Sequence, residues 1–237
     1  MSFLKAEWKK LMMVNYEIDP QILTEDVPFG TELDTWSGRC YVSLIGFMFN
    51  ETRVAGVKVP FHINFEEVNL RFYVKRHEGD EWKRGVVFIK EIVPKPAIAL
   101  VANALYNENY EALKMDHRWD FNEDEGQVAY SWKKAGQWQQ MSLTCTGTPE
   151  AITPGSEAEF IMEHYWGYAR VNDQKSTEYE VTHPKWLHYP VTSYELNVDF
   201  EKTYGSRFGF LSNTKPTSVF LAEGSAITVE GKKIIKG

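Results

Sequence analysis

The stretch FEEVNLRFYVKR, residues 65–76, alternates between two kinds of side chain. Over residues 67–74 the even positions are apolar, and the odd positions hold Glu67, Asn69, Arg71 and Tyr73. A period of two is that of a β-strand with two distinct faces. The apolar face must pack on a core, whereas the polar face either meets water or lines a polar pocket. The orientation of this polar face therefore limits what the chain can do.

Strand-like segments of this kind dominate the chain. Runs rich in β-branched and aromatic residues are separated by Gly, Pro or polar turns. They cover residues 39–50, 56–65, 69–76, 84–94, 118–121, 127–134 and 138–147, with further pieces around 177–182, 192–200, 216–221 and 225–230. This pattern predicts an α+β fold of mostly antiparallel strands, arranged as a barrel or a strongly curved sheet. No linker is visible, so we expect a single domain over residues 1–237.

A few segments predict helices beside the sheet. Residues 3–13 have the apolar spacing of an amphipathic helix, and residues 19–33 hold at most one short helix. The small apolar run 97–106 predicts a buried helix. Ser156 and Glu159 fit the capping box S-x-x-E. A helix would follow within 153–170 and present on one face Phe160, Ile161, His164, Tyr165 and Tyr168.

Composition excludes several classes of protein. The 237 residues carry a formal net charge of −7, and no run of Lys and Arg exceeds two, so we expect no nucleic-acid partner. No apolar run approaches the roughly 18 residues of a membrane span, and the N-terminus lacks the pattern of a signal peptide. We therefore expect a cytoplasmic protein with no membrane contact. Cys40 and Cys145 should be reduced and buried.

Catalytic motifs are absent. The chain has no nucleotide-binding glycine loop, no nucleophile elbow and no metal-binding H-E-x-x-H or C-x-x-C pattern, so we expect no metal and no cofactor. Of the six histidines, His164 is the most notable because aromatic residues surround it. It is either a core histidine bonded to a backbone carbonyl or an acid/base group of a pocket.

Two details favour an inward orientation for the polar face of residues 67–73. Its Glu, Asn, Arg and Tyr differ from the mixture usual on solvated strands. Ile63 and Phe65 also share the parity of Glu67, so a bulge or change of layer is expected at Glu66–Glu67. A buried Arg71 would need a carboxylate partner, supplied by the protein or by a ligand.

Several pieces in order resemble the YqjF-like family of bacterial proteins, namely residues 16–49, FEEVNLRFYV (65–74), RGVVFIKEIVP (84–94) and PGSEAEFIMEHYWGYA (154–169). That family is similar to the acetoacetate-decarboxylase-like superfamily. The resemblance implies a cone-shaped β-barrel with two or three flanking helices and an internal pocket. It also implies that Glu67 is a pocket glutamate and that Arg71 binds an acid.

The resemblance breaks at the catalytic nucleophile. Acetoacetate decarboxylases form a Schiff base on one of two adjacent lysines. The matching stretch here, residues 104–115, places Tyr110 and Glu111 where that pair would stand, and Lys114 is the nearest amine. Acetoacetate decarboxylase activity is therefore not expected.

Three hypotheses remain. The first is a protein that binds a small organic acid in a barrel pocket formed by Glu67, Asn69, Arg71, Tyr110 and His164. The second is an enzyme for a small keto acid or carbonyl compound, acting through Lys114 or through Glu67 and Tyr110 as acid/base groups. The third is a scaffold for a protein partner. A homo-oligomer is compatible with each of them.

Overall fold

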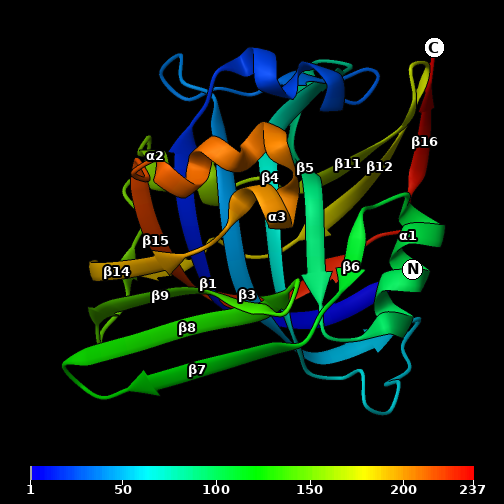
Figure 1. Cartoon of the computed structure of the whole chain (residues 1–237). Helices are drawn as coiled ribbons and strands as arrows, with labels where there is room; N and C mark the ends of the chain where they lie inside the picture. Colours follow the sequence, from blue (N-terminus) through cyan, green and yellow to red (C-terminus); the bar gives the residue numbers. More distant parts are fainter. Residues whose placement is uncertain (1) are drawn as a thin grey trace.

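Long antiparallel strands form the larger of two sheets in the computed structural model of the chain (Figure 1). The structure describes residues 2–237, except for the side chains of Leu105 and Tyr106. The main strands are β1 (Leu4–Glu17), β3 (Tyr41–Val54), β4 (Phe65–Glu78), β5 (Glu81–Val93), β11 (Trp166–Asn172), β12 (Lys175–Thr182) and β15 (Ser218–Val229). They run in the order β15-β1-β3-β4-β5-β11-β12, and β12 also pairs with β15. The two ends of this run of strands are therefore joined.

Short strands extend this sheet at its edges. They are β2 (Glu32–Leu33), β6 (Tyr110–Ala112), β10 (Glu150–Ala151), β13 (Leu187–Tyr189) and β16 (Lys233–Lys236). β6 pairs with β5 in parallel, and so does β11, whereas the other pairings are antiparallel. The sheet is therefore mixed but mostly antiparallel, as the sequence predicts.

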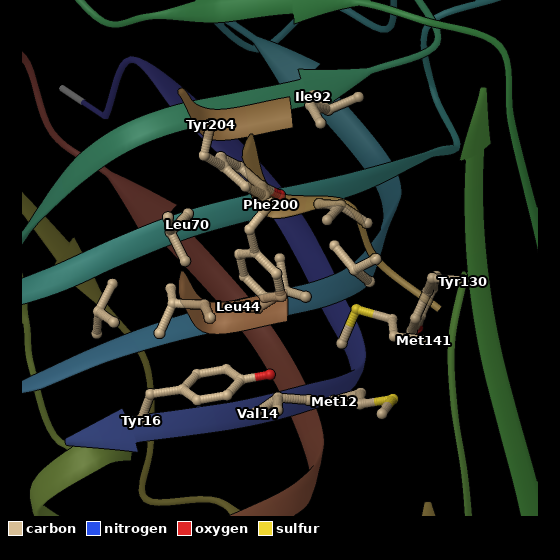
Figure 2. Close-up of a cluster of buried hydrophobic side chains, with 14 of the residues drawn as sticks. Met12, Val14, Tyr16, Leu44, Leu70, Ile92, Tyr130, Met141, Phe200 and Tyr204 are labelled. Atoms are coloured by element: carbon tan, nitrogen blue, oxygen red, sulfur yellow. The ribbon is translucent and has the colours of Figure 1, made fainter. Parts of the chain in front are cut away.

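A second sheet of four strands crosses the first (Figure 1). Its members are β7 (Met115–Phe121), β8 (Glu125–Lys134), β9 (Gln137–Thr146) and β14 (Val191–Asn197), in the order β14-β9-β8-β7. The main hydrophobic core fills the space between the two sheets. Figure 2 shows part of this core, where Leu44 and Leu70 of the larger sheet lie in one cluster with Tyr130 and Met141 of the second.

Helices are few and short. They are the 3-10 helix η1 (Pro20–Asp26), α1 (Pro96–Tyr106), α2 (Glu157–Met162), α3 (Phe200–Tyr204) and the 3-10 helix η2 (Ser206–Asn213). Phe200 of α3 packs into the main core, at 5.7 Å between ring centroids from Tyr16 (Figure 2). None of the helices in the described residues is long and apolar enough to cross a bilayer. Cys40 and Cys145 are free thiols and buried, as expected.

The helix predicted over residues 3–13 is wrong, because this segment is strand β1. Its pairing with β3 contains two register shifts, between Lys5 and Glu7 and between Lys9 and Met12. Each irregularity changes which face the following residues occupy. The apolar positions therefore follow spacings of three and four, which imitate the period of a helix. Figure 1 shows this segment as a long strand within the larger sheet.

Two other predictions of secondary structure are corrected. Residues 56–64 form an irregular loop between β3 and β4 instead of a strand, and Phe61 at its tip is 87% exposed. The helix expected within 153–170 ends at Met162, because from Tyr165 the backbone bonds to the sheet. Its start is confirmed, since the Ser156 hydroxyl accepts a bond from the Glu159 amide at 3.2 Å.

Helix α1 is present where it was predicted, but it is not buried. Leu100 is 72% exposed and Val101 is 47% exposed. The helix begins at Pro96, and its C-cap Asn107 has the left-handed backbone conformation that often ends helices. Its small apolar residues cover one side of an internal cavity instead of filling a core.

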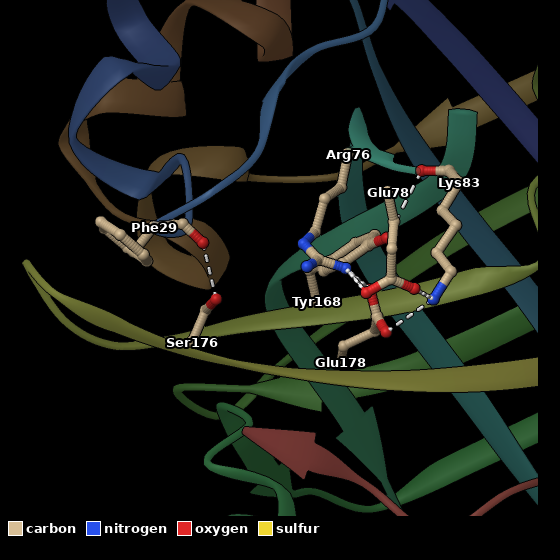
Figure 3. Close-up of polar contacts among 7 residues, drawn as sticks. All are labelled: Phe29, Arg76, Glu78, Lys83, Tyr168, Ser176 and Glu178. Atoms are coloured by element: carbon tan, nitrogen blue, oxygen red, sulfur yellow. Dashed lines mark hydrogen bonds and ion pairs between the residues drawn. The ribbon is translucent and has the colours of Figure 1, made fainter. Parts of the chain in front are cut away.

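Ion pairs fasten β12 to the hairpin of β4 and β5 (Figure 3). The carboxylate of Glu178, 2% exposed, accepts bonds from Arg76 at 3.0 Å and Lys83 at 3.1 Å. Glu78 contacts the same two cations from the solvent side. Because β12 also carries Tyr179 of the internal cavity, this network holds one wall of the cavity in place.

Candidate functional site

A cavity of about 330 Å³ lies on the face of the larger sheet opposite the second sheet. Most of its lining is apolar, and one wall consists of aromatic side chains. Trp8 lies 5.2 Å from Phe47 and 6.3 Å from Trp186 between ring centroids, and Phe49 stacks on Phe65 at 4.7 Å. Such a concave, mostly apolar space with a few polar groups is the usual form of a small-molecule site.

The polar face of β4 points into this cavity. Glu67, Asn69 and Arg71 all line it and are 3%, 1% and 9% exposed. The residues between them pack in the main core on the opposite side of the strand. Both faces of β4 are therefore buried, and the polar row is not a solvated surface.

No bulge lies at Glu66–Glu67, contrary to the prediction. The pairing of β3 with β4 is continuous from Phe65 to Phe72. Phe65 and Glu67 share the cavity face, which accommodates both an aromatic ring and a carboxyl group. Glu66 points the other way and bonds to His117 of β7 at 2.7 Å.

The bulge lies instead on the neighbouring strand β5. Leu70 pairs with Lys90 and Arg71 pairs with Phe88, so Ile89 is the extra residue. Before the bulge Phe88 faces the cavity, and beyond it Glu91 does, although the two residues have opposite parity. The bulge therefore directs Glu91 into the cavity instead of into the main core.

Three adjacent strands place a row of polar side chains side by side. Asn69 of β4 lies opposite Glu91 of β5, which in turn lies beside Tyr110 of β6. The Asn69 amide donates to Glu67 Oε1 at 2.9 Å, and the Tyr110 hydroxyl donates to Glu67 Oε2 at 3.3 Å. The row thus holds two carboxyl groups, one amide and one phenol in the wall of the cavity.

A third carboxyl group joins the row from the segment before β6. Glu108 accepts a bond from the Tyr179 hydroxyl at 3.0 Å, and both side chains line the cavity. Tyr179 lies opposite Gly167 of β11, where a Cβ atom would come within 2.1 Å of the tyrosine ring. Only glycine at this position leaves room for Tyr179 to reach Glu108.

Burial makes these acids weak. It raises the pKa of Glu67 to about 7 and that of Glu108 to about 8. The pKa of Glu91 lies well above its ordinary value because of burial and the neighbouring Glu108 and Glu67. At neutral pH a large part of this cluster is therefore protonated, and it can donate hydrogen bonds as well as accept them.

Arg71 supplies the positive charge of the cavity. Its Nη2 donates to the carbonyl of Ile161 in α2 at 3.2 Å, and its Nε has no hydrogen-bond partner. In the described part of the chain no carboxylate forms an ion pair with it. A buried guanidinium with a vacant donor can bind an anion that enters the cavity.

His164 lies beside Arg71 but is fixed by another acid. Its Nε2 lies 3.2 Å from Asp34, which also accepts a bond from Arg84 at 2.6 Å. Burial lowers the pKa of His164 to about 4, so the ring is neutral at physiological pH. Its Nδ1 has no hydrogen-bond partner. The neutral ring can accept a hydrogen bond at this atom. His164 does not lie in the helix that was predicted to contain it, but between α2 and β11.

All five residues predicted for the site line this one cavity. Four further polar residues line it that were not predicted from the sequence, namely Glu91, Glu108, Tyr179 and His183. The adjacent charges of Lys90 and Glu91 within an apolar strand were a usable signal, since neighbours on a strand point to opposite sides. The sequence around the other three residues contains no pattern that would place them in a pocket.

Lys114 lies outside the cavity. It is exposed, and its Nζ lies 5.7 Å from the ring centroid of Trp138 in β9. Glu111 also points away, to Lys90 and Lys134. Among the described lining residues there is no lysine, so the proposed Schiff base on Lys114 has no support in the geometry. The same residues also contain no group of three side chains arranged to hold a metal ion.

The fold defines the class of this protein. It is similar to an acetoacetate decarboxylase-like enzyme from Sphingomonas wittichii RW1, with a TM-score of 0.67 and 12% identity over 100% of this chain and 94% of the other. Acetoacetate decarboxylase from Legionella pneumophila gives a TM-score of 0.64 and 14% identity over 98% and 86% of the two chains. The enduracididine biosynthesis enzyme MppR gives a TM-score of 0.69 and 11% identity over 100% of this chain and 90% of the other. The chain therefore has the acetoacetate-decarboxylase-like fold.

Sequence comparison identifies the family within this fold. Residues 5–226 match DUF2071, a family described as an uncharacterized conserved protein, and the chain belongs to it. The uncharacterized protein YqjF of Bacillus subtilis (strain 168) is 33% identical over 72 residues. That match spans 30% of this chain and 30% of YqjF. The chain is thus a member of the DUF2071 family that has the acetoacetate-decarboxylase-like fold.

Proposed function

We propose that this protein binds a small organic acid in its internal cavity, with Arg71 holding the carboxylate. One observation carries the proposal. The guanidinium of Arg71 is buried in a mostly apolar cavity, donates to one backbone carbonyl, and keeps its Nε vacant. Burying a cation without a counter-ion is costly, and a bound carboxylate would remove that cost through paired hydrogen bonds.

The rest of the cavity suits the carbon skeleton of such an acid. The aromatic wall of Trp8, Phe47 and Trp186 offers apolar contact, and the carboxyl row accommodates polar substituents. The related fold of MppR has been solved in complex with pyruvate, a small keto acid, at 11% identity and a TM-score of 0.68. This supports a small acid as the class of ligand.

Binding assays on the intact protein test the proposal. A panel of carboxylic acids would be screened by native mass spectrometry and by thermal shift, followed by titration calorimetry. Arg71→Met should weaken binding of any acid found by about one hundredfold, because a charge-assisted bidentate contact is lost. Arg118→Met, on the exposed surface of β7, is the matched control and should change nothing. The proposal fails if no acid binds, or if Arg71→Met binds as well as the wild type.

A second candidate function rests on the pKa of Glu67. A carboxyl group with a pKa of about 7 can exchange protons at neutral pH, and the Tyr110 hydroxyl bonds to it. An enzyme acting on a keto acid or related carbonyl compound could use this pair as its acid and base. A substrate screen, repeated with Glu67→Gln, tests this function: turnover that survives in Glu67→Gln would exclude it.

A further inference from the structure

The carboxyl cluster of the cavity forms no ion pair within the described chain. Glu67, Glu91 and Glu108 converge from β4, β5 and the segment before β6, and none of them forms an ion pair among the described residues. Three carboxyl groups thus line one cavity that contains a single guanidinium, that of Arg71. Arg71 lowers the pKa of Glu67. Burial and the neighbouring Glu108 and Glu67 raise the pKa of Glu91, and burial raises that of Glu108 against the hydrogen bond from Tyr179.

Two acceptor atoms in this cluster lack a donor. Glu91 Oε2 and Asn69 Oδ1 have no hydrogen-bond partner, although the two residues are 2% and 1% exposed. They lie opposite each other on β4 and β5, on the face that lines the cavity. Buried acceptors are normally satisfied in proteins. A ligand group that donates several hydrogen bonds could therefore bind both atoms.

We propose that the ligand carries a cationic donor group, an amine or a guanidine, which binds the carboxyl cluster while its carboxylate binds Arg71. This inference rests on the proposed function and names its ligand class: a small zwitterionic acid. An ammonium group has three donors and a guanidinium five, enough to satisfy Glu91 Oε2 and Asn69 Oδ1 together. The aromatic wall would contact the carbon chain between the two charged ends.

Binding of such a cation should release a proton. The charged and titratable groups that face the cluster are Glu67 and Arg71 of β4, Glu91 of β5, Glu108, Tyr110 of β6 and Tyr179 of β12. Below neutral pH the acids of this cluster are mostly protonated in the empty cavity. A bound ammonium group favours the ionised form of a neighbouring carboxyl, whose proton then leaves to the solvent.

Matched probes separate the two ends of the ligand. Pentanoate, 5-aminopentanoate, 5-hydroxypentanoate and pentylamine would be titrated by calorimetry at pH 6, in buffers of different ionisation enthalpy. We expect 5-aminopentanoate to bind at least about tenfold more tightly than the other three and to release a proton. Amino acids with a chain one carbon shorter or longer would be titrated in the same way, to find the distance between the two charged groups that fits the cavity.

Conservative variants assign the effect to the cluster. Glu91→Gln and Glu108→Gln keep the shape of the side chain. Each should reduce the ratio of the affinity for 5-aminopentanoate to that for pentanoate to about one and abolish the proton release. Glu123→Gln, in an exposed turn of the second sheet, is the control. Circular dichroism and thermal unfolding would establish that each variant is folded.

The outcomes distinguish this inference from the proposed function. If pentanoate and 5-aminopentanoate bind equally and no proton is released, the zwitterionic ligand is excluded and the acid-binding function stands. If the hydroxy acid matches the amino acid, the group is a neutral donor and the cationic assignment is overturned. If none of the acids binds, both proposals fail.

Discussion

Asn69 of β4 lies directly opposite Glu91 of β5, and its amide donates to Glu67 on its own strand at 2.9 Å. The amide thus bonds to one carboxyl group and lies opposite a second on the neighbouring strand. Its hydrogen bond lowers the pKa of Glu67 against the larger effect of burial, which raises it to about 7. The amide therefore helps to set the pKa of Glu67.

Replacing this amide should make Glu67 a weaker acid. In Asn69→Leu the donor is absent while burial is unchanged, so the pKa of Glu67 should rise above about 7. Titration of the side-chain carboxyl carbons by NMR, on protein labelled at glutamate, would measure the shift. Glu67→Gln identifies the resonance. A pKa that stays the same or falls in Asn69→Leu would contradict the assigned role of the amide.

Stability should depend on pH through the same cluster. An unfolded glutamate ionises near pH 4.5, whereas Glu67 and Glu108 ionise at about 7 and about 8 in the folded protein. Between these pH values the unfolded chain has released protons that the folded chain retains. The free energy of unfolding therefore falls as pH rises, by about 1.4 kcal/mol for each unit by which a pKa is raised. The double variant Glu67→Gln, Glu108→Gln lacks these groups.

The free energy of unfolding of this double variant, relative to the wild type, should therefore increase from pH 4.5 to pH 8. Urea denaturation at several pH values measures it. His164, with its pKa lowered to about 4, has the opposite effect, since its contribution is lost as pH falls from 6.5 to 4. It is present in both proteins and cancels in the difference. A difference that is constant across this range would refute the raised pKa values.

Borohydride trapping should yield no adduct. A Schiff base requires an amine in the cavity, and the described lining residues include no lysine. The protein would be incubated with pyruvate or acetoacetate and borohydride, with too little reagent to modify surface lysines. Its intact mass should then be unchanged. Lys114→Ala should behave like the wild type. A single adduct that maps to one lysine and is displaced by a bound acid would disprove this expectation.

Glu178 should contribute more to stability than Glu78, although both contact Arg76 and Lys83 (Figure 3). The carboxylate of Glu178 is buried, so Glu178→Gln leaves two cations facing a neutral group and should cost about 1–3 kcal/mol. Glu78 is half exposed, and solvent and salt weaken its contacts. Glu78→Gln should therefore cost clearly less in urea denaturation. Equal losses would mean that burial is not the deciding factor.

Gly46 of β3 should tolerate no larger side chain. A Cβ atom there would lie 2.7 Å from the ring of Tyr130 and 3.2 Å from the sulfur of Met141, where the second sheet packs on the first. Gly46→Ala should destabilise the protein by about 1–3 kcal/mol through this overpacking. At Gly231 an added Cβ would meet nothing within 4 Å, so Gly231→Ala should be neutral in the same thermal or urea denaturation. Equal effects of the two substitutions would show that close packing at Gly46 does not limit stability.

Regular alternation decided which strands could be predicted. β4 is paired without interruption with β3, so its two faces can be read directly from residues 67–74. β1 contains two register shifts and was mistaken for a helix, and β5 contains one that hides the orientation of Glu91. Bulges depend on pairing partners that are distant in the chain, so a local pattern does not reveal them.

Local chemistry likewise predicted the start of α2 but not the exposure of α1. The bond from the Glu159 amide to Ser156 joins residues three positions apart, which a short motif can encode. The position of α1 depends on the cavity that it covers. Glu108 and Tyr179 meet only because β12 lies beside the glycine of β11, a relationship between segments 71 residues apart.

The burial of β4 on both faces has a consequence for how a ligand reaches the cavity. Its apolar side belongs to the core between the sheets, so this wall of the cavity cannot move outward without breaking that core. Exposed residues line the cavity elsewhere, in α1 and in the loop of residues 56–64. A ligand held by Arg71 would therefore enter and leave on the side of α1 and the loop of residues 56–64, away from the strand that binds it.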